Sequence, residues 1–324
     1  MFARVSIHAK SGVRGLVRRA VLAYPAASLA LAIAAAAVRL SCRDRWPVLS
    51  TLFYATPPVV PAALLAAGAT MWRLRGRRRA AAGAFAAAAL LAAWFVAASW
   101  RTPPAASGEG PGVRLLFWNV GWGQMVWDRL ASECGDVSAD VLVLVETGVP
   151  GQEEFGDRAA AFPEHEVATP GGGIRALVRG RIESSDLTRI EGGGRLAHFV
   201  IATRGRRLDV LLCDLASNPL RSRGPAFEAI RARLEAPASA PRVLLGDFNT
   251  PPDSVHFDPI RRSWRRAFEA AGDGYDATWP VPVPLLPLDQ VWVGPEIGVS
   301  RCRHLWSLRS DHRAVLADLE VPAN

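Results

Sequence analysis

Leu244-Leu245-Gly246-Asp247-Phe248-Asn249 is the stretch that decides the fold of this 324-residue chain, because an acid and an amide directly follow a short apolar run. Further along, Ser310-Asp311-His312 places another acid beside a histidine. Carboxylate and amide oxygens are ligands for a hard divalent cation, and an imidazole can move a proton near neutral pH. Together these groups are what the hydrolysis of a phosphate ester requires.

Polar side chains of the same kinds follow other apolar runs. Asn119 and Glu146 each come directly after such a run, and Asp289 lies within another. Asparagine and aspartate are favoured in turns, so each residue taken alone is better interpreted as a turn former. The whole set, repeated at the ends of or within five apolar runs, favours side chains that converge on one site.

Short apolar runs also predict the strands of the fold. The expected strands are Val113–Trp118, Val141–Val145, Ile174–Val178, Phe199–Ala202, Asp209–Cys213, Arg242–Leu245, Leu288–Val293 and Ala314–Leu319. Helix-like stretches at Gln124–Cys134 and Pro225–Leu234 lie between them, and Arg204-Gly205-Arg206 predicts a turn between two antiparallel strands. Because strands outnumber helices, we expect an α+β fold with two packed sheets and helices outside.

The net charge of +8 is unevenly distributed along the chain. Residues 1–101 hold 14 Lys and Arg and a single acid, Asp44, which gives +13. Residues 102–324 hold 24 basic and 29 acidic residues, which gives −5. The basicity therefore belongs to the amino-terminal part, and the net charge gives no support to broad polyanion binding by the remainder.

Three runs without a charged residue, at about 20–38, 47–72 and 80–100, predict three transmembrane helices within a membrane anchor of residues 1–101. Each is near the roughly 20 apolar residues that a helix needs to cross a bilayer. Pro57, Pro58 and Pro61 would kink the second run, for which a hydrophobic hairpin or re-entrant segment is the alternative. We expect an integral membrane protein.

The basic residues that flank these runs predict the orientation in the membrane. Their numbers are five before the first run, three in the first loop, five in the second loop and one after the third run. This alternation favours an amino terminus inside and a carboxy-terminal domain outside the cytoplasm. Residues 102–112 are rich in proline, glycine and serine and predict a linker, so the domain spans 113–324.

From about Val113 to Val321 the chain resembles the endonuclease/exonuclease/phosphatase superfamily, whose fold is typified by deoxyribonuclease I. The motifs that carry the resemblance, in chain order, are Phe117–Val120, Ala139–Glu146, Gly172–Leu177, Gly246–Asn249, Leu288–Val291 and Ser310–His312. Ala277-Thr278-Trp279-Pro280 further resembles bacterial membrane-anchored members. The resemblance implies a four-layer fold, a β-sandwich of two sheets flanked by helices.

The resemblance also implies a cofactor and its ligands. It implies Mg²⁺ or Mn²⁺ held chiefly by Glu146, with Asn119 and Asp311 close by, and Asn119 would also contact the substrate. Asp247 and Asn249 would position the attacking water and the scissile phosphate.

The same resemblance implies that Asp289 orients His312, and a carboxylate partner does fix the tautomer of an imidazole. No serine or cysteine nucleophile motif is present in the sequence. Direct attack by water on a phosphodiester or phosphomonoester is therefore the expected mechanism.

Asp214 departs from the superfamily pattern, which usually has a histidine there that donates a hydrogen bond to the phosphate. An ionised carboxylate cannot donate and would repel a phosphate. If the turn at Arg204–Arg207 closes a hairpin with Gly205 near its middle, His198 opposes Leu212 and lies diagonal to Asp214, so it could be the displaced donor. A shift by one residue would put His198 on the other face.

Two functions follow from these observations. The first is a membrane-anchored, metal-dependent phosphoesterase, with nucleic acid as the default substrate and phospholipid headgroups next. The alternative, motivated by Asp214, is a catalytically impaired member of the fold that acts as a membrane-tethered binding protein. Asn218, Arg221 and Arg223 are further candidate phosphate contacts, and a solvated loop is the preferred interpretation for two of these three.

Overall fold

The computed structural model describes residues 3–103, 112–121, 132, 134, 137–148 and 162–323, with the side chains of residues 3–17 left out. Two compact units are present, Met1–Ala98 and Ser99–Asn324. Most of the expected linker and most of the helix expected at 124–134 lie outside the described residues.

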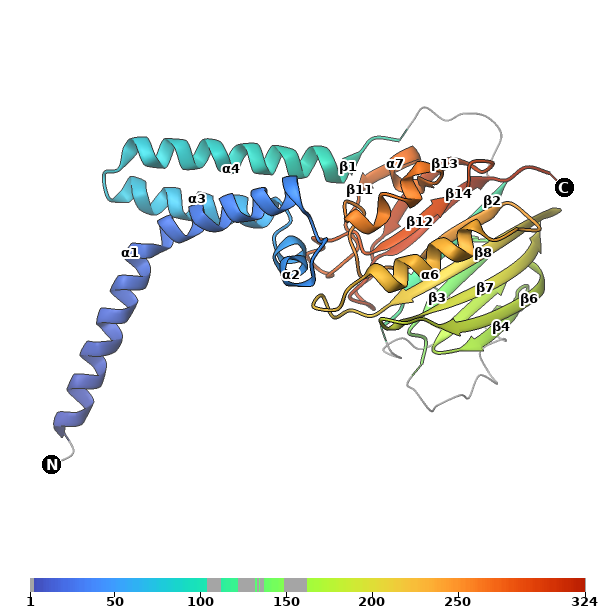
Figure 1. The fold of residues 1–324 in the computed structure, drawn as a ribbon, viewed down its shortest axis with the longest axis horizontal. Coiled ribbons are helices and arrows are strands. Elements are labelled where there is room, and N and C mark those ends of the chain that lie inside the picture. The colour runs from blue at the N-terminus through green and yellow to red at the C-terminus, as the bar shows by residue number, and fades with distance from the viewer. Residues whose placement is uncertain are drawn as a thin grey trace. The chain divides into compact units, whose positions relative to one another are not determined.

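The first unit is helical (Figure 1). Its helices are α1 (Ala3–Ser41), α2 (Pro47–Ala55), α3 (Val59–Leu74) and α4 (Arg78–Ser99). Within the described chain, the segments Arg18–Ser41 and Arg78–Ser99 are long and apolar enough to cross a membrane. The helices α2 and α3 would form a third span only as a pair bent by 64°. Pro57 and Pro58 lie at that break. The helix is interrupted there because a proline has no N–H to donate to the preceding turn.

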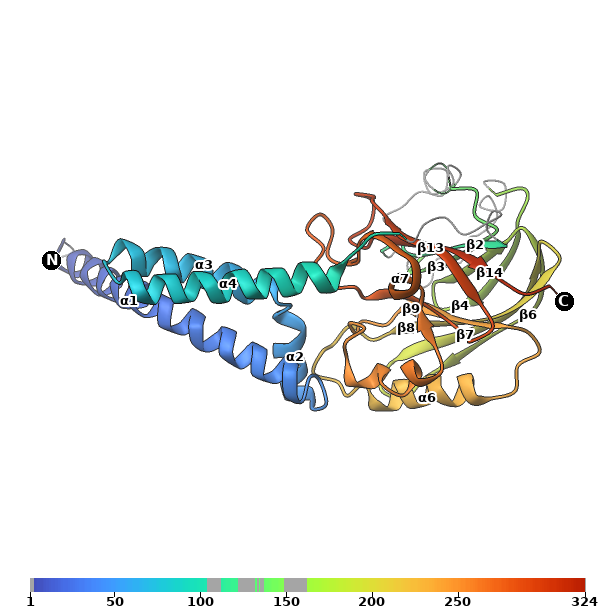
Figure 2. The same ribbon diagram turned by 90° about the horizontal axis from the view of Figure 1, so that it is seen from above.

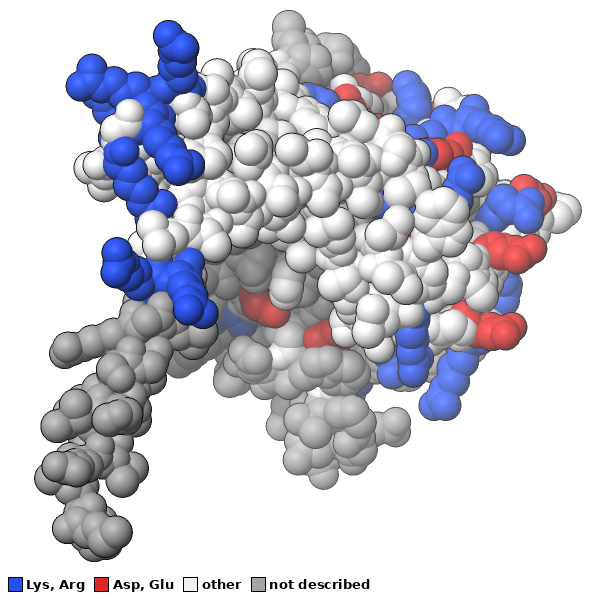
Figure 3. Space-filling model, turned by 60° about the vertical axis from the view of Figure 1, so that its left-hand side comes forward, with Lys and Arg blue, Asp and Glu red and all other residues white. Residues whose placement is uncertain are grey.

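Small residues let α1 and α3 approach closely. A Cβ atom on Gly68 would lie 2.6 Å from Ser28 Oγ and 3.1 Å from the Cα atom of Pro25. Exposed arginines are found where α1 enters the apolar segment and in the turn between α3 and α4: Arg18, Arg19, Arg73, Arg75, Arg77, Arg78 and Arg79. Figure 3 shows basic side chains gathered beside a broad uncharged surface, which is the distribution that a membrane helix requires at its ends.

The second unit contains two mixed sheets, which lie one over the other in Figure 2. Among the described residues the first has eight strands in the order β1 (Trp100–Arg101), β11 (Gly272–Tyr275), β13 (Gly298–Leu305), β14 (Ala314–Glu320), β2 (Val113–Asn119), β3 (Val141–Val145), β5 (Ile174–Val178) and β4 (Glu166–Gly171). The second has six, in the order β10 (Arg265–Arg266), β12 (Asp289–Val293), β9 (Arg242–Asp247), β8 (Arg206–Leu215), β7 (Gly194–Thr203) and β6 (Gly180–Arg189).

The main hydrophobic core lies between the two sheets, because alternate side chains of every central strand point inward. Phe117 and Val143 from the first sheet share this core with Leu212 and Leu245 from the second. The helix α6 (Gly224–Glu235) covers the outer face of the second sheet through Phe227 and Ile230. The predicted α+β sandwich of two sheets flanked by helices is confirmed.

Gly246 explains how the opening motif fits this fold. Its φ is 147°, and a Cβ atom there would lie 1.8 Å from the carbonyl oxygen of Cys213 on the neighbouring β8. Only glycine lets β8 and β9 approach this closely. Asp214 and Asp247 are thereby paired at the carboxyl ends of two parallel strands.

Candidate active site

One row of charged residues, which we call the charged row, crosses the six-stranded sheet at the edge where β8 and β9 end. Paired positions, taken from β6 to β12, are occupied by Arg189, Arg195, Asp214, Asp247 and Asp289. Residues two apart in a strand share a face, so these side chains point toward the other sheet, as the core residues at that spacing do. The row is basic on β6 and β7 and acidic on β8, β9 and β12.

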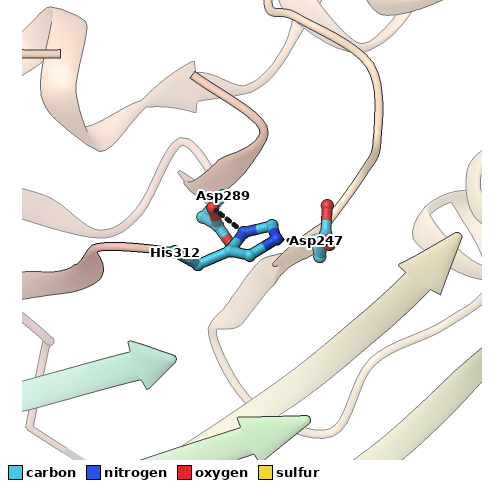
Figure 4. Close-up of side chains that lie close together, drawn as sticks. All are labelled: Asp247, Asp289 and His312. Carbon is cyan, nitrogen blue, oxygen red and sulfur yellow. Dashed lines mark hydrogen bonds and ion pairs between the residues drawn. The ribbon is translucent and has the colours of Figure 1, made fainter. Parts of the chain in front are cut away.

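At the acidic end, His312 forms a pair with Asp289 (Figure 4). His312 Nδ1 lies 2.8 Å from Asp289 Oδ2, and its Nε2 lies 3.9 Å from Asp247 Oδ2. The backbone around the histidine is fixed by Ser310, whose Oγ accepts from the amide N–H of His312 at 3.0 Å. The imidazole is thus held with one nitrogen on Asp289 and the other toward Asp247.

Asp247 is fixed by two amide groups. Asn119 Nδ2 donates to Asp247 Oδ2 at 3.1 Å, and the backbone N–H of Asn249 donates to Asp247 Oδ1 at 2.9 Å. Asn249 has a φ of 45°, a left-handed conformation that asparagine tolerates better than most residues, and its side chain donates to the carbonyl of Leu215 at 2.8 Å. The opening motif therefore forms a tight turn that presents one carboxylate to His312.

Glu146, Asn119 and Asp311 lie together beside this carboxylate. Glu146 follows β3 with a φ of 58°, is half-buried, and accepts a hydrogen bond from the Asn119 side chain. Asp311 is exposed and accepts from Trp279 Nε1 at 3.0 Å. A Cβ atom on Gly121 would lie 3.6 Å from Oδ1 of Asp311. The backbone N–H of Gly121 donates to Oδ1 of Asn119, so this glycine lies between the two side chains.

Burial and crowded acids shift the pKa values of these groups. Burial, followed by the charges of Asp214 and Asp311, raises the pKa of Glu146. Burial and the charge of Asp289 raise the pKa of Asp247 to about 7. Burial lowers the pKa of His312, but Asp289 and Asp247 outweigh it and raise the value to about 10. The acidic end therefore carries more carboxylates than its one histidine can neutralise.

The donor set fits a hard divalent cation. Glu146, Asn119 and Asp311 offer only oxygen atoms as ligands, which suits Mg²⁺ or Mn²⁺, and a cation there would offset the excess of carboxylates. Asp247, Asp289 and His312 also bring possible ligand atoms within 4.8 Å of one another. In that group, however, His312 Nδ1 and Asp289 Oδ2 are already bonded to each other. The oxygen set is therefore the better candidate.

Asp214, the departure from the superfamily pattern, is paired with Arg195. Arg195 Nη1 donates to Asp214 Oδ2 at 2.9 Å, and the carboxylate is nearly buried. Burial raises the pKa of Asp214, and the charge and hydrogen bond of Arg195 oppose that shift. Arg195 was not predicted from the sequence. A charged residue that follows Gly192-Gly193-Gly194 at the start of a strand could have indicated a site residue.

The expected register of the β7–β8 hairpin is wrong by one residue. His198 opposes Leu211 instead of Leu212, because the turn has two central residues, Arg204 and Gly205, both with positive φ. His198 therefore lies on the outer face of the sheet, away from Asp214. The structure does not bring it to the site as the displaced phosphate donor.

Of the three candidate phosphate contacts in the loop after β8, one lines the cavity. Arg223 is buried and donates to the carbonyls of Ala216 and Asn249, so it holds the loop in place. Asn218 accepts from the N–H of Leu220 in a local turn. Arg221 lines a cavity of about 560 Å³ together with Glu146, Asp214, Arg189, Arg195 and Asn249.

Thr278 is a second residue whose role the sequence did not reveal. Its Oγ1 accepts from the backbone N–H groups of Leu288 and Asp289, at 3.0 and 3.1 Å, and so fixes the start of β12. It belongs to the motif Ala277–Pro280, whose next residue, Trp279, donates to Asp311. This motif therefore holds Asp289 and Asp311 in position, but its residues do not line the cavity.

The chain belongs to the Endonuclease/Exonuclease/phosphatase family, whose model matches residues 116–312. This match covers more than half of the chain and contains every site motif, so the resemblance inferred from the sequence is confirmed. No curated protein sequence matches this chain.

Several solved structures are similar in fold. A family protein from Bacteroides vulgatus is 18% identical with a TM-score of 0.53, and the match covers 65% of this chain and 99% of that one. The human nocturnin catalytic domain, solved with a bound sulfate anion, is 16% identical with a TM-score of 0.54, covering 68% and 99%. Truncated TDP2 from Caenorhabditis elegans is 18% identical with a TM-score of 0.51, covering 63% and 96%. At these identities the likeness concerns the fold alone.

Proposed function

We propose that this protein is a membrane-anchored, divalent-metal-dependent phosphoesterase that cleaves its substrate by direct attack of water. The observation that carries the proposal is the pair of His312 and Asp289, with the free imidazole nitrogen directed at Asp247. Glu146 lines a cavity together with Asp214 and Asn249, which are the strand neighbour and the backbone hydrogen-bond partner of Asp247. Hydrolysis of a phosphate ester requires a histidine that can donate to the phosphate, oxygen ligands for a cation and space for the substrate.

In the proposed reaction Asp247 takes a proton from the attacking water, whose oxygen forms the new bond to phosphorus. The electron pair of the breaking P–O bond leaves with the ester oxygen, which takes a proton from solvent. His312, kept cationic by Asp289, donates a hydrogen bond to a phosphoryl oxygen, and Asn249 orients the phosphate. When bound at Glu146, Asn119 and Asp311, a divalent cation would polarise the phosphoryl oxygen and offset the transition-state charge.

We propose that α1 and α4, with the bent pair of α2 and α3, anchor the protein in a bilayer. The proposed orientation has the amino terminus inside and the catalytic unit outside the cytoplasm. Its support is the exposed arginines that lie before the apolar part of α1 and between α3 and α4.

Phospholipid headgroups are the substrate class that we favour over nucleic acid. Large apolar side chains are exposed on three loops that carry or contact site residues: Leu220, Val283, Trp306 and Leu308. Leu220 precedes Arg221 of the cavity, and Trp306 and Leu308 precede His312 in one loop. Apolar and tryptophan side chains in such positions suit contact with a lipid surface, and the net negative charge of residues 102–324 disfavours nucleic acid.

The alternative function, a membrane-tethered binding protein without activity, rests on Asp214. The ion pair with Arg195 weakens this alternative, because it neutralises the charge that would repel a phosphate. Metal titration separates the two functions. A chain without affinity for Mg²⁺ or Mn²⁺ and without hydrolysis would favour the binding protein.

The test uses the full chain in detergent and bis(p-nitrophenyl) phosphate, a soluble diester. We expect hydrolysis that stops with a chelator and returns with Mg²⁺ or Mn²⁺. Glu146→Gln should abolish metal-dependent turnover, whereas Glu235→Gln, in an exposed ion pair on α6, should not. Full activity of Glu146→Gln would exclude the proposed cation site.

A further inference from the structure

The basic end of the charged row is unfavourable by itself. Arg189 and Arg195 are directly opposite each other on β6 and β7, with both side chains on the inward face. Like charges in directly opposed positions destabilise a pair of strands. Asp214 offsets the charge of Arg195, so a bound anion that contacts Arg189 would balance the positive charge that remains at this end of the row.

Glycines make room for the guanidinium groups at this end. A Cβ atom on Gly172 would lie 2.6 Å from Cδ and 2.7 Å from Nε of Arg195. A Cβ atom on Gly193 would lie 2.9 Å from Nη1 of Arg221. Both glycines have positive φ, 64° and 93°. The two arginines are therefore placed against bare backbone at the cavity wall instead of extending freely into solvent.

The three arginines of the cavity exceed their carboxylate partners. Arg195 is paired with Asp214, whereas in the part of the chain that the structure describes neither Arg189 nor Arg221 has a carboxylate within 4.0 Å. At the other side of the same cavity stand Glu146 and Asn249, next to the proposed cation site. Arg195 and Arg189 of this cationic wall thus lie about two to three strand spacings, or about 10–15 Å, from Asp247 along the sheet.

We propose that Arg189, Arg195 and Arg221 bind a second phosphate of the substrate, separate from the phosphate that is hydrolysed. Guanidinium groups match phosphate geometry and form charge-assisted hydrogen bonds with it. The inference rests on the proposed function and narrows its substrate class to a phospholipid whose headgroup carries a phosphate in addition to the scissile ester. Asp214 then holds Arg195 in position, and Arg195 is the group that donates to the phosphate.

The experiment measures inhibition of bis(p-nitrophenyl) phosphate hydrolysis by the full chain in detergent, at a fixed free Mg²⁺ concentration. The inhibitors are alkanediol bisphosphates of increasing chain length, each compared with its monophosphate. We expect inhibition to be strongest at one length that spans about 10–15 Å. At that length the bisphosphate should bind roughly tenfold or more tightly than the monophosphate.

Arg221→Gln is the main variant, because it removes charge without breaking an ion pair among the described residues. It should abolish the preference for the bisphosphate, and Arg195→Gln should do the same. Arg231→Gln, on the exposed face of α6, should keep the preference. Equal inhibition by both inhibitor types, or an unchanged preference in Arg221→Gln, would overturn the second phosphate site.

Failure of the proposed function gives a different result. If the chain hydrolyses no diester but calorimetry still shows tighter binding of the bisphosphate, the phosphoesterase proposal fails and the second phosphate site stands. With an active chain, vesicles that contain a phospholipid with a phosphorylated headgroup should be cleaved faster than vesicles without it. Faster cleavage of only a 5′-phosphorylated oligonucleotide would overturn the lipid assignment.

Discussion

Two aspartates of the six-stranded sheet each pair with a histidine, and the two pairs differ in what surrounds them. His312 and Asp289 are 2.8 Å apart at the edge that carries the charged row, whereas His198 Nε2 and Asp209 Oδ1 are 2.9 Å apart on the outer face. In the second pair Arg242 donates two hydrogen bonds to Asp209, at 3.0 and 2.9 Å. The first pair has further carboxylates around it and no such arginine among the residues described.

The surroundings separate a structural pair from the pair that we propose to be catalytic. Arg242 Nη1 also donates to the carbonyls of Arg233, Leu234 and Ala236, which end α6, so this network joins a helix end to the sheet. Burial raises the pKa of Asp209, but His198 and Arg242 outweigh it and lower the value. At the other pair burial and acids raise the pKa of Asp247. A histidine next to an aspartate therefore indicates a functional site only when the other charged groups around the pair are considered as well.

The largest expected effect separates the two pairs by activity. His312→Ala should lower the turnover of bis(p-nitrophenyl) phosphate by about 10³-fold, the range expected for a group that moves or donates a proton. His198→Ala should leave turnover within about twofold of the parent, because it faces away from the site. Steady-state kinetics check both, and equal losses in the two variants would remove the distinction.

The next effect separates them by stability. Arg242→Ala leaves Asp209 buried beside His198 without its arginine and should lower the free energy of unfolding by about 3 kcal/mol. Urea denaturation followed by tryptophan fluorescence measures the change. The folded variant should keep the turnover of the parent, and Arg231→Ala on exposed α6 should change stability by less than about 0.5 kcal/mol.

Thr278→Val tests the support behind His312. The valine cannot accept from the two N–H groups at the start of β12, so we expect a loss of about 1–3 kcal/mol in unfolding free energy. Because Asp289 is displaced with them, turnover should also fall. Thr278→Ser keeps the acceptor and should recover both quantities, and turnover equal to the parent in the valine variant would contradict the positioning of Asp289 by this hydroxyl.

The smallest effect concerns pH. The hydrogen bond from His198 to Asp209 raises the pKa of the imidazole against the opposing effect of burial. A group whose folded-state pKa is raised stabilises fully below its unfolded pKa of about 6.5 and loses this contribution as the pH rises through the folded value. His198→Gln should therefore cost about 1 kcal/mol or less below pH 6.5, with the difference from the parent shrinking at higher pH. A constant difference would show that protonation has no part in it.

Much of the fold followed from apolar runs. The expected strands at Val141–Val145 and Ile174–Val178 match β3 and β5 residue for residue, because both are buried along their whole length. By contrast β6 and β4 were not predicted, because their side chains are exposed or only partly buried and the sequence shows no continuous apolar run. Strand prediction succeeded where burial, and not pairing alone, selects the residues.

The site was only partly accessible to sequence reasoning. The ends of buried strands indicated Asp247 and Asn119, because polar residues recur at the ends of several such strands. Arg195 was missed because its partner Asp214 is distant in sequence, and their pairing depends on the hairpin register. That register depends on whether the turn at Arg204 has two or three residues, which composition does not determine.

The two-residue turn between β7 and β8 also limits how this gene can change. Insertion or deletion of one residue within β7 would exchange its inward and outward side chains, moving Arg195 out of the cavity while the backbone ladder could still form. The same shift would turn the core side chains Phe199 and Ile201 outward, so it would cost stability as well. We therefore expect insertions and deletions in this hairpin to involve two residues at a time. A change of two residues keeps Arg195 and Asp214 on the same face of the sheet.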